Sequence, residues 1–194
     1  MLKAELRREA LARRRALSEE EVARRSEALW LQLHQLFPLR EWQWLHLFLP
    51  IARQKEPDTW PLIQQLWAEL PELQLAVPVV QPDGHTLRHF HLTPETRLEN
   101  NRWGIPEPVG AAEILPPQLD AILVPLLAFD EVGHRVGYGK GFYDQFLAQC
   151  RPDALRIGLS LEPPVLRIED AWPGDVPLHA CITPKQVWWF PEAK

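Results

Sequence analysis

Cysteine and serine are both scarce in this sequence. The two cysteines, Cys150 and Cys181, lie far apart and form no Cys-x-x-Cys motif. This excludes a disulfide-stapled scaffold and favours a reduced, intracellular protein. The three serines lie outside any Gly-x-Ser-x-Gly motif, which argues against a serine hydrolase.

Long hydrophobic runs are also missing. The longest apolar stretch, Ala121 to Phe129, is too short to cross a bilayer and contains Pro125. Near the N-terminus, Lys3, Glu5 and Arg7 interrupt any hydrophobic secretory region. We therefore expect a cytoplasmic protein that has no membrane partner.

The chain has no excess of positive charge either. Its formal net charge of -5 excludes a general nucleic-acid binder. The charge is uneven, because residues 1–25 hold eight Lys or Arg and five Glu, whereas the remainder holds 13 basic and 21 acidic residues. The basic segment could bind an anion or a nucleic acid, or it could be a solvated helix face. The acidic remainder argues against nucleic acid as a partner.

The sequence does contain enough apolar residues for a folded core. With 194 residues, 46% of them hydrophobic, and no repeated period, it predicts one domain over residues 1–194. Helical patterns alternate with short apolar strand patterns. The expected helices span 2–17 and 18–37, begin again near 60, and cover 142–150; the expected strands span 44–49, 73–80, 86–91, 120–127, 155–160 and 180–183. Because most strands lack polar alternation, we expect an α/β fold with a largely parallel sheet covered on both faces.

The segment from Gly133 to Asp144 carries the sharpest chemical signal. Glycines alternate at 137, 139 and 141 after a buried strand and before a helix, so the backbone can adopt positive φ and a ligand can approach it closely. Successive N–H groups there can line an anion site, to which Arg135 and Lys140 add positive charge. The segment matches neither the P-loop nor the Gly-x-Gly-x-x-Gly fingerprint. It predicts a phosphate-binding loop of another kind; the alternative is an ordinary flexible loop.

Further positions could join this loop. Asp144 could bind a divalent cation delivered with a nucleotide, with Asp170 and Asp175 as weaker second candidates, or it could simply be a helix-start aspartate. Trp103 lies in a turn rich in Gly and Pro and could stack on a flat heterocycle, or it could fill the core. Glu56 follows the first strand, where open α/β sheets bind ligands, or it is a solvated loop residue.

A cluster of histidines raises the question of a metal site. His89 and His91 share one strand face with His85 nearby, but no Cys or carboxylate stands at ligand spacing. A polar, half-exposed strand is therefore favoured over a zinc site.

Several motifs together resemble a known family. They are Lys3-x-x-x-Arg7; Phe48-Leu49-Pro50 followed by Glu56-x-x-Thr59; Asn101-x-Trp103-Gly104-Ile105-Pro106-Glu107-Pro108; Val124-Pro125-x-x-x-Phe129-Asp130; Gly133-x-Arg135-x-Gly137-x-Gly139-Lys140-Gly141-x-Tyr143-Asp144; and the late Asp175. In this combination, which runs nearly end to end, the sequence resembles the 5-formyltetrahydrofolate cyclo-ligase (5,10-methenyltetrahydrofolate synthetase) family.

The resemblance implies a single three-layer α/β/α domain on which a helical arm of about residues 1–37 is docked, and we expect a monomer. It also implies ATP- and Mg²⁺-dependent cyclisation of 5-formyltetrahydrofolate to 5,10-methenyltetrahydrofolate, with release of ADP and phosphate, through a phosphorylated formyl (imidoyl phosphate) intermediate. The alternative is a non-catalytic folate- or nucleotide-binding relative. Such a protein would be expected to lose one of Lys3, Arg7, Glu56 or Asp144, and all four are present.

The same resemblance implies roles for individual residues. The positions implied for ATP are Lys3, Arg7, Arg135, Val136, Gly137, Tyr138, Gly139, Lys140, Gly141, Phe142 and Tyr143. Those implied for folate are Glu56, Trp103, Tyr138, Gly139, Lys140, Gly141 and Phe142; those for Mg²⁺ are Asp144 and Asp175; and those for catalysis are Arg135 and Lys140. The sequence departs from the family pattern at two places. The stretch 51–55 is longer than expected at the pocket rim, and His179 stands where many members have Asp, near the implied metal position.

Overall fold

The computed structural model describes residues 1–101 and 104–190. Within these residues, eight strands form one sheet in the order β12-β11-β10-β7-β1-β2-β3-β6. These strands are β1 (Trp44–His46), β2 (Gln74–Val80), β3 (Leu87–Leu92), β6 (Glu113–Ile114), β7 (Ala121–Pro125), β10 (Leu155–Leu159), β11 (Ala180–Ile182) and β12 (Val187–Trp189). The central strands from β11 to β2 pair in parallel, and β12, β3 and β6 pair antiparallel at the two edges. The expected α/β fold with a mostly parallel sheet is confirmed.

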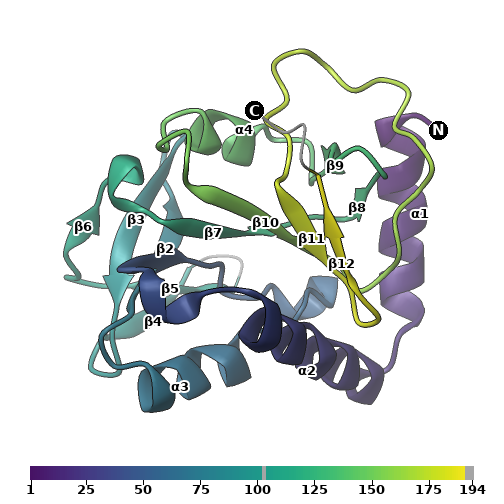
Figure 1. Cartoon of the computed structure of the whole chain (residues 1–194). Helices are drawn as coiled ribbons and strands as arrows, with labels where there is room; N and C mark the ends of the chain where they lie inside the picture. The colour runs from purple at the N-terminus through teal and green to yellow at the C-terminus, as the bar shows by residue number, and fades with distance from the viewer. Residues whose placement is uncertain (102–103, 191–194) are drawn as a thin grey trace.

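Helices cover both faces of this sheet. Figure 1 shows α2 (Glu19–Leu36) and α3 (Trp60–Glu69) on one side and the short α4 (Phe142–Leu147) on the other. Local sequence explains where the longer helices begin. The side chain of Ser18 caps α2 by accepting a hydrogen bond from the Glu21 amide, and Pro61 occupies the first turn of α3, where no amide donor is needed. α4 ends at Leu147, earlier than the expected residue 150.

The central strand β7 explains why the strand patterns lack polar alternation. Ala121 and Leu123 pack into the apolar cluster that includes residues of α2 and α3, whereas Ile122 and Val124 pack into the cluster that includes Phe146 of α4. Since each of these four residues faces one helical layer or the other, all four positions are apolar.

Strand order places a topological switch beside β1. From β1 the chain passes through α3 to β2 on one side, while β7 pairs with β1 on the other side. In open α/β sheets, the loops that leave the carboxyl ends of strands at such a point diverge and leave a crevice. A ligand site is therefore expected where β1 and β7 end.

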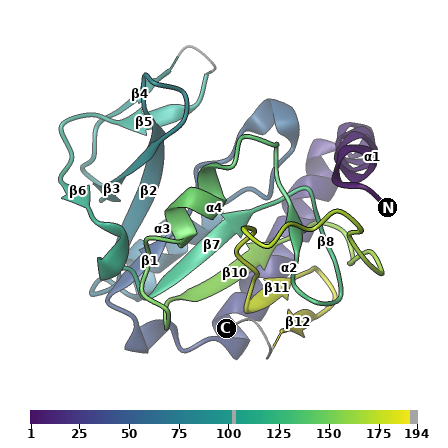
Figure 2. The same ribbon diagram turned by 90° about the horizontal axis from the view of Figure 1, so that it is seen from above.

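Helix α1 (Lys3–Ala16) lies beside the ribbon of β8 (Ala128–Phe129) and β9 (Arg135–Val136), at the opposite end of the molecule from the ribbon of β4 (Leu98–Asn100) and β5 (Pro106–Pro108) (Figure 2). Leu6 is fully buried there in a small apolar cluster with Ala128, Val136 and Ile168. The basic N-terminal segment is therefore not a solvated helix on all sides.

Among the described helices, none is both long enough and apolar enough to span a bilayer.

His85 is exposed and His91 is half-buried, as expected for a half-exposed strand, but His89 departs from this pattern. His89 on β3 is buried, lies with its ring 3.9 Å from that of Phe146, and shares a 3.0 Å hydrogen bond between its Nδ1 and Nε2 of His46. Burial lowers the pKa of His46, and burial lowers the pKa of His89 to about 4. Within residues 1–101 and 104–190, no group of three or more His, Cys, Asp or Glu side chains could hold a metal ion.

The buried histidines make stability depend on pH. The pKa of His89 is about 4 in the folded protein against an ordinary value of 6.5, so the unfolded chain binds more protons below pH 6.5. The stability present above pH 6.5 is lost progressively as the pH falls towards 4. Between pH 7 and pH 5, His89 should account for a loss of about 2 kcal/mol in the free energy of unfolding. Urea titrations of the unchanged protein and of His89→Asn at both pH values check this, and an equal loss in both proteins would contradict it.

Candidate functional site

A pocket of about 450 Å³ lies at the carboxyl edge of the sheet. Phe48 and Leu49 line it just after β1, Val80 lines it at the end of β2, and Pro125 lines it at the end of β7. This is the switch point that the strand order defines, and the volume falls in the range of small-molecule sites.

The glycine-rich loop between β9 and α4 forms one wall of the pocket. Gly139 and Gly141 adopt φ values of +89° and +72°, in the region that favours glycine, whereas Gly137 does not use this freedom. Nε of Arg7 on α1 donates a 2.9 Å hydrogen bond to the Gly137 carbonyl. A Cβ placed on Gly139 would lie 3.2 Å from Cζ of Arg7, so helix and loop are packed closely.

Most of the expected site residues meet at this pocket. Those that line it are Lys3, Arg7, Glu56, Arg135, Gly137, Tyr138, Gly139, Lys140, Gly141, Phe142, Tyr143, Asp144 and Asp175. Val136 does not line it, because its side chain points into the apolar cluster under α1. Trp103 lies outside the described residues.

Two ion pairs form among the residues that line the pocket. Nη2 of Arg135 lies 2.6 Å from Oδ1 of Asp144, and the Lys3 ammonium pairs with Oδ2 of Asp175. Burial opposes ionisation of Asp175, but the hydrogen bonds from Lys3 and from the Trp172 amide outweigh it and hold the pKa of this carboxyl below its usual range. The Asp144 carboxylate is engaged as well. One of its oxygens accepts from Arg135 and from the Val176 amide at 3.1 Å.

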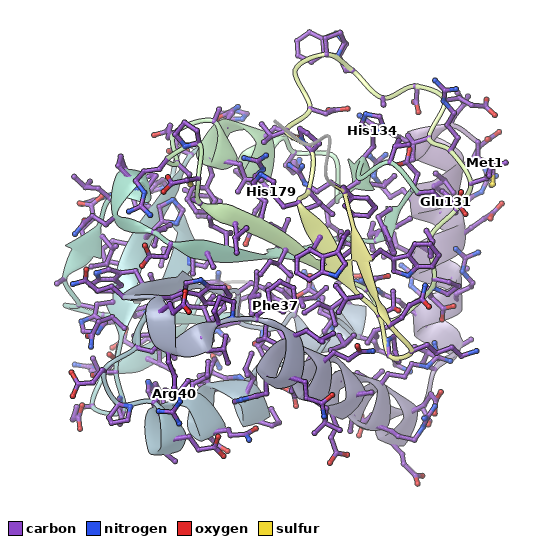
Figure 3. The ribbon with its side chains drawn as sticks, in the orientation of Figure 1. Met1, Phe37, Arg40, Glu131, His134 and His179 are labelled. Atoms are coloured by element: carbon purple, nitrogen blue, oxygen red, sulfur yellow. The ribbon has the colours of Figure 1, made fainter. Side chains whose placement is uncertain are left out.

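Other acidic and basic residues near the pocket take structural roles. Asp170 accepts a 2.7 Å hydrogen bond from the Lys3 amide at the start of α1, and it does not line the pocket. His179 lies just before β11 (Figure 3), where its Nδ1 accepts a 3.0 Å hydrogen bond from the Arg156 amide. His179 does not line this pocket.

Glu56 is buried, which excludes the interpretation of a solvated loop residue. Its side chain accepts hydrogen bonds of 2.7 Å from the Tyr138 hydroxyl at Oε1 and from the Ile51 amide at Oε2. Burial raises the pKa of Glu56, while these two hydrogen bonds and the positive charge of Arg14 act in the opposite direction. The longer stretch 51–55 folds into a 3₁₀ turn (Ala52–Gln54) that brings the Ile51 amide to this carboxylate.

Sequence reasoning missed Arg14. This residue lies in an Arg13-Arg14-Arg15 run that reads as solvated, yet its side chain is only 3% exposed and reaches Tyr138. The spacing of residues 3, 7, 10 and 14 was an available signal, because steps of four and three place them on one stripe of a helix. Lys3 and Arg7 line the pocket from this stripe.

A buried polar atom at the pocket lacks a partner among the described residues. The Tyr143 hydroxyl is buried and forms no hydrogen bond with any residue that the structure describes. Burial raises the pKa of Tyr143, so the hydroxyl keeps its proton. A buried hydroxyl of this kind is expected to find its partner in a bound ligand or a water molecule.

Fold and pocket together define an α/β protein with a basic, glycine-lined ligand pocket at the carboxyl edge of a mostly parallel sheet. Residues 1–166 match the model of the 5-formyltetrahydrofolate cyclo-ligase family, and the chain belongs to that family. The 5-formyltetrahydrofolate cyclo-ligase of Escherichia coli (strain K12) is 32% identical over 180 residues, which cover 91% of this chain and 97% of that protein. The corresponding protein of Haemophilus influenzae is 33% identical over 133 residues, covering 66% of this chain and 70% of its own.

Solved structures agree with this assignment. The NMR structure of Aquifex aeolicus 5,10-methenyltetrahydrofolate synthetase matches with a TM-score of 0.83 and 33% identity, over 100% of this chain and 95% of that one. A 5,10-methenyltetrahydrofolate synthetase from Mycoplasma pneumoniae shares the fold with a TM-score of 0.75, over 95% of this chain and 99% of that one, at 24% identity. The resemblance that the sequence motifs indicated is confirmed.

Proposed function

We propose that this protein catalyses the ATP-dependent cyclisation of 5-formyltetrahydrofolate to 5,10-methenyltetrahydrofolate, with release of ADP and phosphate. The observation that carries the proposal is a single pocket that joins a glycine-rich loop, four cations and a buried carboxylate. The cations are Lys3, Arg7, Arg135 and Lys140, and the carboxylate is Glu56. Cations and loop amides suit a polyphosphate, and a buried carboxylate suits the N–H donors of a pterin ring.

The two substrates would occupy adjacent parts of the pocket. We place the ATP phosphates at the glycine-rich loop beside α1, where Arg7 and Lys3 approach. The folate would lie beyond the loop against Glu56, with Trp103 as a further contact implied by the family pattern. Tyr138 lies between the two parts, since its backbone belongs to the loop and its hydroxyl reaches Glu56.

The carboxylates fit a magnesium ion that would arrive with ATP. Oδ2 of Asp144 and Oδ1 of Asp175 form no hydrogen bond or ion pair with the residues described, although the other oxygen of each carboxylate is engaged. Magnesium is commonly held by one or two carboxylates together with substrate phosphates, so a larger cluster of acidic residues is not needed. When bound, the ion would neutralise charge on the phosphate oxygens.

The reaction requires the protein to align the two substrates and to supply positive charge near the transferred phosphoryl group. The formyl oxygen attacks the γ-phosphorus of ATP, and the bond from that phosphorus to the bridging oxygen breaks as ADP leaves. Nitrogen 10 of the folate then attacks the phosphorylated formyl carbon and loses its proton, and phosphate leaves with the former formyl oxygen. Arg135 and Lys140 are proposed to stabilise the charge on the transferred phosphoryl group, and the loop is proposed to align it.

The experiment is a cyclisation assay with the purified protein, ATP, Mg²⁺ and 5-formyltetrahydrofolate. We expect methenyl absorbance to appear, to require ATP, and to stop when the metal is chelated. If the protein binds ATP or the folate without forming product, the non-catalytic alternative would replace the proposal. If turnover persists after the metal is chelated, the proposed role of magnesium is wrong.

We also propose that residues 1–194 act as one domain, as a monomer in the cytoplasm. Burial of Leu6 and the hydrogen bond from Arg7 to the glycine-rich loop support a single unit in which the N-terminal arm belongs to the pocket. The two cysteines are both unpaired, which suits a reducing compartment.

A further inference from the structure

Arg14 is a buried guanidinium without a directly bonded counter-ion. It is 3% exposed and forms no ion pair with any residue in the described ranges. Its Nη2 donates to the Leu126 carbonyl, and its Nη1 lies 3.3 Å from the Tyr138 hydroxyl oxygen. Burying a charge costs free energy of folding unless other groups stabilise it. Packing alone therefore does not explain why Arg14 is buried.

The direction of the hydrogen bonds connects Arg14 to Glu56. A guanidinium can only donate, so the Tyr138 oxygen must accept from Arg14. The single proton of that hydroxyl is then directed to Oε1 of Glu56, at 2.7 Å. The hydrogen bonds of the Arg14–Tyr138–Glu56 series thus all point from the cation towards the carboxylate. In such a series, the hydrogen bond donated by Arg14 strengthens the one that Tyr138 donates to Glu56.

The three residues of this hydrogen-bonded series belong to separate elements. Arg14 belongs to α1, Tyr138 to the glycine-rich loop, and Glu56 to the loop after β1. The Glu56 loop is also tied to α1 by the Lys55 ammonium, which donates to the carbonyls of Arg15 and Leu17. Helix α1 therefore holds both loops at the pocket, and the hydroxyl of Tyr138 is the point where they meet.

We propose that Arg14 is a positioning residue which, through the Tyr138 hydroxyl, holds the Glu56 carboxylate in the orientation that receives the N–H donors of the folate substrate. The inference rests on the proposed function, in which Glu56 contacts the folate. It assigns Arg14 an effect on folate binding and none on binding of the ATP phosphates. Arg7, two helical turns before it, contacts the loop backbone instead.

The test compares four single variants. Tyr138→Phe removes the hydroxyl but leaves the contact of Arg14 with Leu126, and Arg14→Met removes the donors while keeping much of the side chain. Arg14→Lys keeps the charge. Arg13→Met is the matched control, because Arg13 on the same helix is 45% exposed and pairs only with Glu9 among the described residues.

The measurements are the Michaelis constant and kcat for 5-formyltetrahydrofolate, together with dissociation constants for 5-formyltetrahydrofolate and for ATP from tryptophan fluorescence. We expect Tyr138→Phe and Arg14→Met each to raise the folate Michaelis and dissociation constants about tenfold, with ATP affinity and kcat changed much less. Arg14→Lys should recover part of the loss, and Arg13→Met should resemble the unchanged protein.

The double variant Arg14→Met/Tyr138→Phe distinguishes positioning from independent damage. If both residues act through one chain, the double variant should weaken folate binding no more than the stronger single variant. Additive losses, or unchanged folate affinity in Tyr138→Phe, would overturn the proposal. Should Arg14→Met fail to fold, Tyr138→Phe and Arg14→Lys decide the matter. If the unchanged protein does not cyclise its substrate, the proposed function fails, while the fluorescence titrations still test the inference.

Discussion

Replacing Lys140 with methionine is expected to lower turnover by about 100- to 1,000-fold, the usual effect of removing one preorganised cationic group from a charged transition state. Lys140 lines the pocket, is exposed to solvent, and forms no hydrogen bond or ion pair with a residue that the structure describes. Its charge is therefore available to the transferred phosphoryl group. For the same reason, its removal should leave the free energy of unfolding nearly unchanged.

Steady-state kinetics and urea unfolding of Lys140→Met provide the measurement. Lys185→Met is the control, since Lys185 is an exposed lysine that lines a different cavity near α2 and β12. Normal kcat in Lys140→Met would show that this lysine is only a solvated charge at the pocket rim. Loss of activity together with a large loss of stability would point to a structural role instead.

The second large effect is expected from Gly139→Ala, which should weaken ATP binding by about 10- to 100-fold. At φ +89° any L side chain is strained, and its Cβ would meet the Arg7 guanidinium at 3.2 Å. The glycine-rich loop, helix α1 or both must then move. Each change displaces the backbone amides and the cation that are proposed to hold the phosphates.

Gly110→Ala separates strain from site damage. Gly110 has φ +70° and nothing within 4 Å of the added Cβ, and it does not line the pocket. It should therefore lose stability from backbone strain and keep its ATP affinity. If a folded Gly139→Ala variant binds ATP as tightly as the unchanged protein, the proposal that this loop binds the phosphates is wrong.

The fold was largely predictable because its signals are local. Apolar strand patterns without polar alternation, separated by helical patterns, indicated a parallel sheet covered on both faces. Ser18 and Pro61 marked two helix starts. The order of the strands could not be read from the sequence, because strands that pair in the sheet can lie far apart along the chain. His46 of β1 and its partner Ile122 of β7, for example, are separated by 76 positions. Only packing of the complete chain selects such a pairing.

The site was predictable as a set of residues and not as a set of contacts. Motifs pointed to Lys3, Arg7, Glu56 and the glycine-rich loop, and the structure brings all of them to one pocket. Val136 was included because it lies in the motif, but a strand alternates its side chains and this one faces the core. The apolar pocket lining from β2 and β3 carried no motif, because ordinary half-buried apolar residues form it.

By itself, then, the sequence determined the fold class, the family and most pocket residues, since these follow from periodicity, glycine spacing and motif chemistry. Tertiary structure alone decided which charges meet. It paired Arg135 with Asp144 and Lys3 with Asp175, across separations of 9 and 172 residues. It also buried Arg14 out of three consecutive arginines and linked it through Tyr138 to Glu56. The physical reason is that the pKa and the role of a charged side chain depend on burial and on neighbours within a few ångströms, and distant segments supply both.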